Sequence, residues 1–469
     1  MHTRPILLLT LALLLLVSAQ TYAQEDYVRP QLPVKWRLPS EQPDHIVLNF
    51  SDDPATTQSV TWRTDTRTQQ AYGEIAIATA APRFWRNAKR VEGTTVTMDA
   101  SRVKSAESKA NYHSVTFTGL APDTLYAYRV GDGQHWSEWI QFRTASQEAE
   151  PFSFLYVGDA QNNLLDLWSR LIREGYRTAP DARFIIHAGD LVNDAHSELE
   201  WHEWFTAGGW IHRTLPSLPL PGNHEYEGYT ELEEENDIEH LAVQWHPQFT
   251  LPQNGPDSLK ETAYYVDYQG TRIVVLNSNE RHEEQAAWAD QVLADNPHPW
   301  SVVTFHHPLF SASGDRDNEE LRNLWKPIFD KHQVDIVLQG HDHSYARGRV
   351  EPLAENVPDG VNMRDVTGTV YVVSVSGGKM YDVKGDWDNY DAVRDRAAEN
   401  TQLFQLINID GDTLRYEAYT AIGELYDAFE LIKDGDKPNQ FVEHQNEAVP
   451  PFTHDNTVPY DLKKTQGNE

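Results

Sequence analysis

Residues Val337–Arg347 have the sequence VLQGHDHSYAR: an apolar run, a glycine, and then His341 and His343 on either side of one aspartate. A short apolar run of this kind is typical of a strand that is buried on both faces of a parallel sheet. Ligand-binding side chains in such sheets gather just beyond the carboxyl ends of the strands. The two histidines therefore predict a binding site if other strands end in the same way.

Four further apolar runs do end in residues that can bind a metal ion. The runs FLYVGD, FIIHAGD, LPLPGNH and VVTFHH end in Asp159, in Asp190, in Asn223 with His224, and in His306 with His307. Each of these ends alone would be an ordinary turn, so the hypothesis depends on the five occurring together. Carboxylates, an amide oxygen and imidazoles suit Zn²⁺, Mn²⁺, Fe or Co, and they contain too much nitrogen for a dedicated calcium site.

The region around these strand ends indicates an α/β domain over residues 151–433. Continuous β-branched runs alternate there with segments of helical period, such as NLLDLWSRLIREGY and EELRNLWKPIFDKH, and this predicts sheets covered by helices. Residues 26–147 differ, because they contain seven short alternating segments, from HIVLNF to WIQFRT, separated by turns such as APDT. Seven short strands with such spacing predict a separate all-β sandwich.

The two ends of the chain have compositions of their own. MHTRP, an apolar run and the small-residue segment SAQTYA predict a secretory signal peptide over residues 1–23, with an uncleaved anchor as the alternative. The apolar run is shorter than the roughly 18 residues of a membrane span. Because the chain also has no cysteine, we expect a periplasmic or secreted protein without disulfides. Residues 434–469 predict a polar C-terminal tail.

Charge restricts the partners. The chain has 71 acidic and 39 basic residues, for a formal net charge of −32. Such a surface repels nucleic-acid backbones and anionic membranes, so we expect no nucleic-acid partner, and no later segment is apolar enough to span a membrane. An anionic substrate would need strong positive charge in the site, which two metal cations would supply. No feature of the sequence sets an oligomeric state.

The same residues resemble a known family. The ordered series Gly158-Asp159, Gly189-Asp190, Gly222-Asn223-His224-Glu225, His306 and Gly340-His341-x-His343 is similar to that of the calcineurin-like metallophosphoesterases, and within them to that of the purple acid phosphatases. The segments NYHSVTFTGLAPDTLYAYRVGDG and WSEWIQFRTA resemble the fibronectin type III-like domain that precedes the catalytic domain of those enzymes. The resemblance extends over Pro43–Glu430.

The resemblance implies a phosphoric ester hydrolase with two divalent metal ions, of Mn, Zn or Fe, that Asp190 bridges. The further ligands that it implies are Asp159 and His343 for one ion, and Asn223, His306 and His341 for the other. It also implies attack on phosphorus by a metal-bound hydroxide. Asp190 and His224 would be the catalytic residues, with His224 facing the phosphate, and His307 would line the same pocket.

Two positions depart from the purple acid phosphatase pattern. Asn193 stands where the family has the tyrosine that binds ferric iron, and Gln161 stands where it has a glycine. The Asp-x-Gln sequence is similar to that of manganese-dependent pyrophosphatases of the wider superfamily, in which the glutamine can be a ligand. Gln161 and Asn193 are therefore candidate additional ligands of a redox-inert or ferrous pair. The alternative for Gln161 is a hydrogen bond to a ligand.

The expected function is that of a secreted metal-dependent phosphatase acting on small phosphomonoesters. A phosphodiesterase or nucleotide pyrophosphatase with the same metal core is the alternative, and a non-catalytic extracellular binding protein is the second. Specificity is expected in three loops, at residues 224–240, 311–320 and 377–390. Within them Arg316, Lys379 and Tyr381 are candidates for contacts with the substrate, and the alternative for all three is exposure to solvent.

Overall fold

A computed structural model describes residues 30, 32–98, 103, 109–226, 240–314, 316–384, 387–435 and 437–444. The predicted signal peptide and residues 445–469 of the predicted tail lie outside the described residues. From Pro33 onward the chain forms one unit, separate from Met1–Leu32. Within the described part of the chain, no helix has the length and apolar character needed to cross a membrane.

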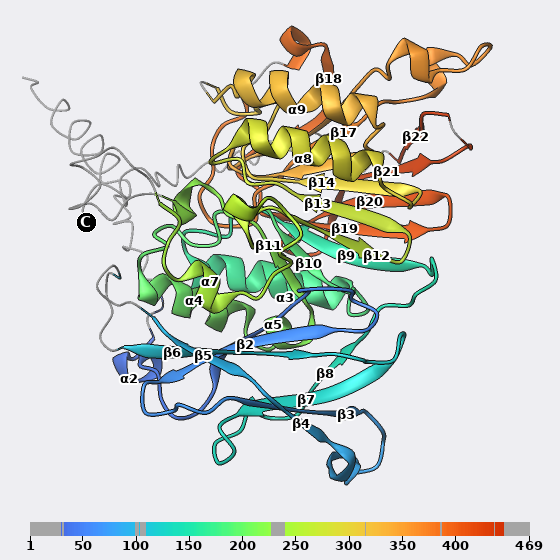
Figure 1. Cartoon of the computed structure of the whole chain (residues 1–469). Helices are drawn as coiled ribbons and strands as arrows, with labels where there is room; N and C mark the ends of the chain where they lie inside the picture. Colours follow the sequence, from blue (N-terminus) through green and yellow to red (C-terminus); the bar gives the residue numbers. More distant parts are fainter. Residues whose placement is uncertain are drawn as a thin grey trace, which may run out of the picture. The chain divides into compact units, whose positions relative to one another are not determined.

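The N-terminal region is a sandwich of two four-stranded antiparallel sheets, in the strand orders β1-β2-β6-β5 and β4-β3-β7-β8 (Figure 1). After the short helix α2 (Val34–Arg37), its strands are β1 (Asp44–Asn49), β2 (Gln58–Asp65), β3 (Tyr72–Ile77), β4 (Lys89–Glu92), β5 (Thr94–Thr97), β6 (Ala110–Phe117), β7 (Leu125–Gly131) and β8 (Ile140–Arg143). Strand β4 is not among the seven predicted segments. Its sequence KRVE is mostly exposed, and it therefore lacks the apolar alternation that marks the other strands.

Two mixed seven-stranded sheets follow, as the α/β pattern predicts. The first has the order β11-β10-β9-β19-β20-β21-β22 and the second the order β12-β13-β14-β15-β17-β16-β18. The first contains β9 (Phe152–Val157), β10 (Ile185–His187), β11 (Ser217–Pro219), β19 (Leu403–Asp410), β20 (Thr413–Thr420), β21 (Leu425–Ile432) and β22 (Gln440–Glu443). The second contains β12 (Tyr264–Tyr268), β13 (Thr271–Val275), β14 (Trp300–Thr304), β15 (Ile336–Gln339), β16 (Tyr345–Val350), β17 (Val370–Val373) and β18 (Ala392–Ala398).

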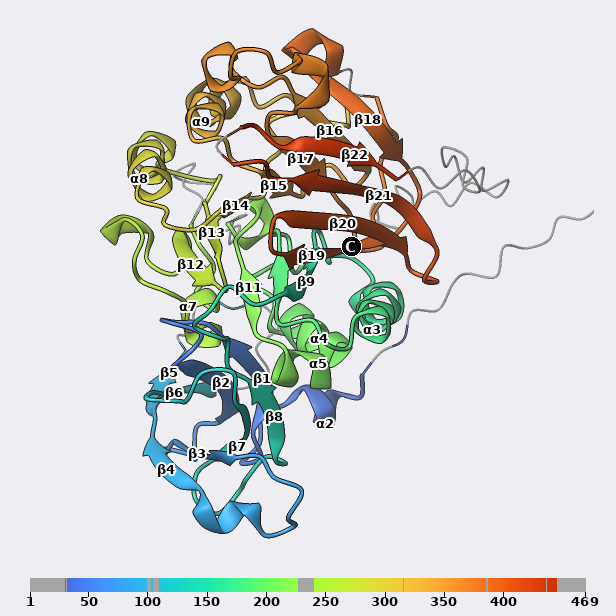
Figure 2. The same cartoon turned by 90° about the vertical axis from the view of Figure 1, so that its right-hand side faces the viewer.

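Helices cover the sheets, and alternate residues of the strands show how. The helices are α3 (Ser169–Thr178), α4 (Glu198–Gly208), α5 (Trp210–Thr214), α7 (Trp245–Gln248), α8 (His282–Ala294) and α9 (Glu319–Lys331). Val303 of β14 belongs to the core beneath α8 and α9, whereas its neighbour Val302 belongs to the larger core between the sheets. This is the period of two that a strand buried on both faces requires. Helix α8 lies beside β14 and β13 in Figure 1, with α9 next to α8, and α3 lies beside β19 and β9 in Figure 2.

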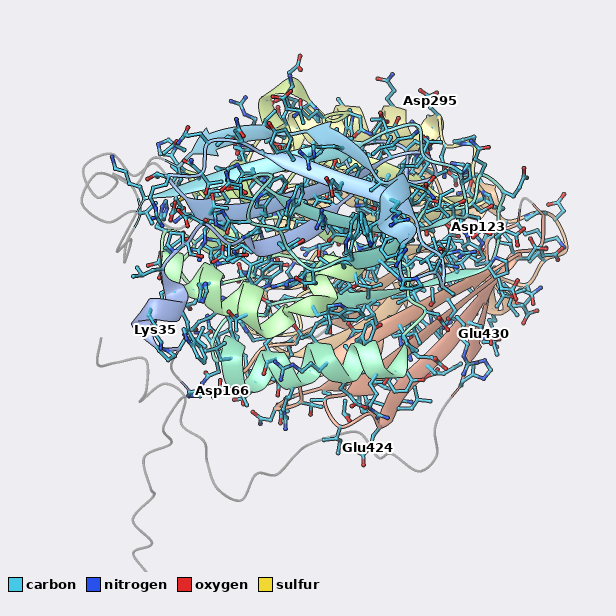
Figure 3. All side chains as sticks on the ribbon, turned by 90° about the horizontal axis from the view of Figure 1, so that it is seen from below. Lys35, Asp123, Asp166, Asp295, Glu424 and Glu430 are labelled. Atoms are coloured by element: carbon cyan, nitrogen blue, oxygen red, sulfur yellow. The ribbon has the colours of Figure 1, made fainter. Side chains whose placement is uncertain are left out.

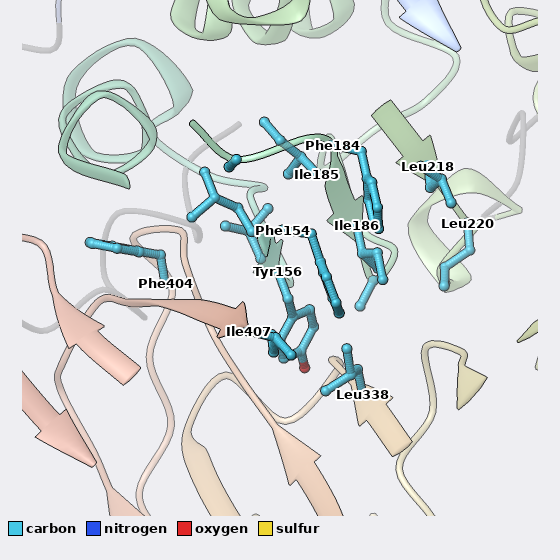
Figure 4. Close-up of a cluster of buried hydrophobic side chains, with 14 of the residues drawn as sticks. Phe154, Tyr156, Phe184, Ile185, Ile186, Leu218, Leu220, Leu338, Phe404 and Ile407 are labelled. Atoms are coloured by element: carbon cyan, nitrogen blue, oxygen red, sulfur yellow. The ribbon is translucent and has the colours of Figure 1, made fainter. Parts of the chain in front are cut away.

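The two sheets face each other across the larger core. Figure 4 shows Tyr156 of β9 and Ile407 of β19 beside Leu338 of β15, and all three are fully buried. Burial of each such side chain contributes about 1.5–3 kcal/mol. The contact holds the ligand-bearing strands of one sheet against those of the other. Exposed carboxylates such as Asp123 and Asp295 lie at the periphery of the molecule in Figure 3.

The C-terminal strands extend the first sheet by an antiparallel meander from β19 to β22. Strand β22 pairs with β21 beyond Lys433, where the predicted α/β domain ends. The predicted tail thus begins with residues of the sheet. The other predicted domain boundaries stay predictions, while the predicted architecture of a β-sandwich followed by helix-covered sheets is confirmed.

Candidate metal centre

The five ligand-bearing strands are β9, β10, β11, β14 and β15. Strands β9, β10 and β11 are parallel neighbours in one sheet, and β14 and β15 are parallel neighbours in the other. Their carboxyl ends bring together two groups of metal-binding side chains, which are Asp159, Asp190 and His343 in the first and Asp190, His306 and His341 in the second. Within each group the ligand atoms lie within 4.8 Å of one another. Asp190 belongs to both groups, as expected for a bridging ligand.

The second group converges tightly and includes Asn223. His306 Nε2 lies 3.2 Å from Asp190 Oδ1 and 3.2 Å from Asn223 Oδ1. His341 Nδ1 lies 3.0 Å from Asn223 Oδ1 and 3.2 Å from His306 Nε2. Two imidazole nitrogens, one carboxylate oxygen and one amide oxygen therefore point at a common centre. This mixed set of nitrogen and oxygen atoms suits a divalent transition metal.

The first group is looser and includes Gln161. His343 Nε2 lies 3.8 Å from Asp159 Oδ1. Gln161 Nε2 donates a hydrogen bond to Asp190 Oδ2 at 2.6 Å and lies 3.3 Å from His343 Nε2. The other end of this amide, Oε1, is buried and has no hydrogen-bond partner among the described residues. Gln161 thus has an unsatisfied buried oxygen on a side chain that contacts Asp190 and His343, and a turn of the amide would let this oxygen bind a cation.

The backbone at the centre is turned into an unusual conformation. Asp159, Asp190, His341 and His343 have φ angles of 48°, 51°, 75° and 50°, in the left-handed region that side chains other than glycine rarely adopt. Such strain persists only where the surroundings hold it in place, and it gathers at functional sites. Gly222 shows how closely the loops approach, because a Cβ atom there would overlap the Asp190 carboxylate.

Backbone carbonyls fix the tautomers of three imidazoles. Nδ1 of His306 lies 2.8 Å from the Ala188 carbonyl oxygen, Nδ1 of His343 lies 3.1 Å from that of Lys379, and Nδ1 of His224 lies 2.7 Å from that of Asn193. A carbonyl oxygen can only accept a hydrogen bond, so each Nδ1 must carry a proton. The Nε2 lone pairs then face the centre, as metal ligation requires.

The centre buries more negative charge than its own side chains neutralise. Burial raises the pKa of Asp159 to about 7, and burial together with Asp190 raises the pKa of Glu225 to about 8. Burial would also raise the pKa of Asp190, but His306 and His224 hold it well below its usual value. Burial would lower the pKa of His306, yet Asp190 raises it to about 9. A site with these shifts fits divalent cations, which would supply the missing positive charge.

Glu225 and Ser278 support the centre, although no metal would contact them. The buried Glu225 carboxylate accepts hydrogen bonds from the backbone N–H groups of Asp190, Leu191 and Gly222 at 2.9, 3.0 and 2.8 Å, and thereby joins two ligand loops. Ser278 Oγ lies 2.8 Å from His307 Nδ1. The GNHE sequence draws attention to Glu225 without showing its role, and nothing in the sequence around Ser278 marks it.

His224 and His307 lie on the more accessible side of the centre. The His224 side chain is 13% exposed and its Nε2 lies 3.9 Å from Asp190 Oδ2, whereas the His306 side chain is fully buried. The His307 ring lies 4.3 Å from that of His341. Burial and the charge of His306 lower the pKa of His307 to about 3, so this imidazole is neutral.

The remaining predicted residues occupy two places. The Asn193 side chain accepts a hydrogen bond from Asn162 Nδ2 at 3.1 Å, and its backbone carbonyl holds His224. The Arg316 guanidinium donates to the carbonyl oxygen of His341, and the Tyr381 ring packs edge-on against His343 with centroids 4.9 Å apart. Lys379 Nζ lies 5.6 Å from the centre of the Tyr381 ring. Residues 227–239 of the first predicted specificity loop lie outside the described residues.

Comparisons with known proteins agree with this geometry. Residues 43–144 match the purple acid phosphatase N-terminal domain, and residues 152–345 match the calcineurin-like phosphoesterase domain. A relative, the Fe(3+)-Zn(2+) purple acid phosphatase 12 of Arabidopsis thaliana, is 26% identical over 57% of this chain, and the match spans 59% of the relative's length. Purple acid phosphatase 18 of the same plant is 23% identical over 73% of this chain and 75% of its own length.

Solved structures share the fold. The purple acid phosphatase PPD1 from yellow lupin seeds superposes with a TM-score of 0.67 at 18% identity, over 84% of this chain and 75% of that one. The matches and the candidate ligand groups together support a dinuclear divalent metal site. The chain thus contains a region that matches the purple acid phosphatase N-terminal domain, followed by a region that matches the calcineurin-like phosphoesterase domain, and it resembles the purple acid phosphatases over both.

Proposed function

We propose that this protein hydrolyses phosphomonoesters at two divalent metal ions, and that it does so in the periplasm or outside the cell. The observation that carries the proposal is the position of Asp190 in both groups of ligand atoms. When bound, two divalent cations would lower the pKa of water and offset the charge of a phosphate. An acidic protein needs such a device to attract an anionic substrate. The N-terminal segment of the sequence supports export.

In this proposal the first ion is held by Asp159, Asp190 and His343, and the second by Asp190, Asn223, His306 and His341. The carbonyl-bound Nδ1 atoms of His306 and His343 keep their Nε2 lone pairs directed at the ions. Glu225 keeps the loops that carry Asp190 and Asn223 together, through its three backbone hydrogen bonds. These contacts fix the ligands before any metal binds.

His224 is the proton donor in this proposal. Its Nδ1 proton is engaged with the Asn193 carbonyl, so Nε2 is the atom that can exchange a proton with the substrate. Protonation at Nε2 would let His224 neutralise the phosphate and then protonate the leaving alkoxide. His307, held neutral and bound to Ser278, would orient a phosphate oxygen without adding charge.

Gln161 completes the first ion's ligand set in this proposal. A rotation of its amide by half a turn would direct the orphaned Oε1, rather than Nε2, toward Asp190 and His343. In Gln161→Leu we expect metal affinity at one of the two sites to fall by about 10- to 100-fold. Metal content after dialysis measures this without reference to activity. Retention of both ions at wild-type affinity would assign Gln161 a hydrogen-bonding role only.

The proposal is tested by metal analysis and hydrolysis assays on one preparation. We expect two equivalents of Mn, Zn or Fe, turnover of p-nitrophenyl phosphate, and loss of turnover on chelation that the same cation restores. Bis(p-nitrophenyl) phosphate is the matched diester. Faster turnover of the diester than of the monoester would indicate a phosphodiesterase rather than a phosphatase. A protein that binds two metals and hydrolyses neither ester would instead support a binding protein.

A further inference from the structure

A cavity of about 350 Å³ adjoins the metal centre on the side of the second and third specificity loops. Residues that line it are Ser313, Gly314, Arg316, Met380, Tyr381 and Lys384. Two contacts connect the cavity to the centre. Arg316 donates a hydrogen bond to the carbonyl of His341, and the Tyr381 N–H donates to the carbonyl of His343 at 2.9 Å. The cavity wall is therefore attached directly to two candidate ligands.

The cavity wall carries positive charge that forms no direct ion pair with a described residue. No described carboxylate lies within ion-pair distance of Arg316 or of the neighbouring Lys379. Both cations lie over the same Tyr381 ring, at 5.1 Å and 5.6 Å from its centre.

Only one carboxylate belongs to the described lining of the cavity, and a lysine balances it. Asp382 Oδ2 lies 3.8 Å from Lys384 Nζ, and about two thirds of each side chain is exposed. Arg316 thus has no carboxylate partner in the lining, although its charge acts on the buried carboxylate of Asp342. In a chain with 71 acidic and 39 basic residues, a cation without a carboxylate partner beside the centre calls for a ligand. The planar guanidinium pairs best with a carboxylate or a phosphate.

We propose that this cavity is a subsite for a second anionic group of the substrate, with Arg316 as the residue that binds it and Lys379 adding to the attraction. The preferred substrates would then be phosphate esters whose leaving group carries a further phosphate or carboxylate. The inference rests on the proposed function, because the first phosphate must occupy the metal centre. The volume suits a small polar leaving group, at the low end of the usual range of roughly 300–1,000 Å³ for ligand pockets.

The test compares three esters with the same three-carbon leaving group: propyl phosphate, 3-(phosphonooxy)propanoate and propane-1,3-diyl bisphosphate. We expect the metal-loaded protein to show a kcat/KM at least about tenfold higher for one or both of the esters with a charged leaving group than for propyl phosphate. The ester with the larger advantage identifies the second group as a carboxylate or a phosphate. Equal kcat/KM values for all three would overturn the subsite and leave the phosphatase intact.

Variants assign the effect to residues. Arg316→Gln should reduce about tenfold the ratio of kcat/KM for the esters with a charged leaving group to kcat/KM for propyl phosphate. The ratio cancels any loss of activity that is common to all three esters. Lys379→Gln should reduce the same ratio by a smaller factor, and it leaves the Lys379 carbonyl in place to hold His343. Lys331→Gln, at the end of α9, is the matched surface control and should leave the ratio unchanged. A ratio that survives both Arg316→Gln and Lys379→Gln would contradict the assignment.

Binding of phosphonates separates the subsite from turnover. By calorimetry, 3-phosphonopropanoate should bind the metal-loaded protein at least about tenfold more tightly than propylphosphonate, and Arg316→Gln should remove the difference. If the protein binds 3-phosphonopropanoate more tightly than propylphosphonate but hydrolyses none of the esters, the result would support the subsite and contradict the proposed phosphatase activity. Metal content of Arg316→Gln is measured in parallel. If the variant loses metal, the result for Lys379→Gln decides.

Discussion

Two buried clusters in this protein contain carboxylates and imidazoles, and they solve the same electrostatic problem differently. One is the metal centre. The other, here called the Arg63 cluster, consists of Arg63, Asp44, Glu198, His45 and His202. The potential ligand atoms of Asp44, His45 and His202 also lie within 4.8 Å of one another, as those at the metal centre do. Residue types and spacing alone therefore do not distinguish the two.

The difference lies in the source of the positive charge. Arg63 is fully buried, and its guanidinium lies 2.8 Å from Asp44 Oδ2, 3.2 Å from His202 Nδ1 and in contact with Glu198. Burial alone would lower the pKa of Arg63, but Asp44 and Glu198 raise it. At the metal centre, no arginine or lysine of the described chain lies within ion-pair distance of Asp159 or Asp190. The Arg63 cluster holds its own cation, whereas the centre requires one from solution.

The largest expected effect comes from the residue that the two ligand groups share. Asp190→Asn removes one buried negative charge with almost no change in shape, so we expect loss of at least one metal equivalent and a fall in kcat of about 10³-fold. Metal analysis and initial rates measure the two effects. Full activity in this variant would show that Asp190 bridges nothing.

The Arg63 cluster should respond in the opposite way. Arg63→Met leaves Asp44 and Glu198 without a cation, and removal of one partner of a buried ion pair costs about 3–5 kcal/mol in the free energy of unfolding. Urea unfolding measures this loss. Because the cluster holds no metal in our account, metal content and kcat should stay at wild-type values. A loss of metal in Arg63→Met would contradict the claim that the Arg63 cluster is independent of metal binding.

Removal of metal should destabilise the protein through the centre alone. With free cation at 100 times its dissociation constant, binding to the folded state adds about 2.7 kcal/mol, which chelation would abolish. Calorimetric unfolding with and without a chelator measures the change. Arg63→Met should lose the same increment as the wild type, whereas Asp190→Asn should lose less. An unchanged melting temperature after chelation in the wild type would contradict the prediction.

The last prediction concerns an imidazole that is held by hydroxyl groups rather than by metal. His113 lies between Thr64 Oγ1 at 2.7 Å and Thr95 Oγ1 at 2.9 Å, and burial lowers its pKa to about 4. The unfolded state therefore binds more protons between pH 6.5 and 4. The contribution of His113 to the free energy of unfolding is fully present above about pH 6.5. As the pH is lowered from 6.5 to 4, this contribution decreases by at most about 1.4 kcal/mol per pH unit.

The measurement for His113 is the slope of unfolding free energy against pH in metal-free protein. His113→Gln should flatten that slope between pH 6.5 and 4 by up to one proton, whatever it does to stability at pH 7. An identical slope in the variant would show that folding does not lower the pKa of His113.

The sequence predicts most of the fold and the residues of the centre, because both depend on local patterns. The runs that end in Asp159, Asp190 and His306 are buried strands with ligands at their carboxyl ends, and parallel pairing brings such ends together. The Arg63 cluster could not be predicted in this way. Its members Arg63 and Glu198 are 135 positions apart and belong to different domains. No short sequence pattern indicates that these two residues are in contact.

Contacts made by backbone atoms could not be predicted from the sequence either. His224 is oriented by the carbonyl of Asn193, and His343 by that of Lys379. A carbonyl oxygen is present at every position, so its identity as a partner leaves no trace in the amino-acid sequence. The same holds for the cavity beside Arg316, which exists only because two loops separated by some 60 residues form its walls.

The strand order of the first sheet has a consequence for how the chain matures. Strand β9, which leads to Asp159, lies between β10 and β19, and β19 begins only at Leu403. A chain ending at residue 345 would contain every candidate ligand, yet the inner edge of β9 would be an unpaired strand edge and a template for aggregation. Pairing over such a sequence separation is slow. We therefore expect the metal centre to become rigid only after β19 has been made and has paired with β9.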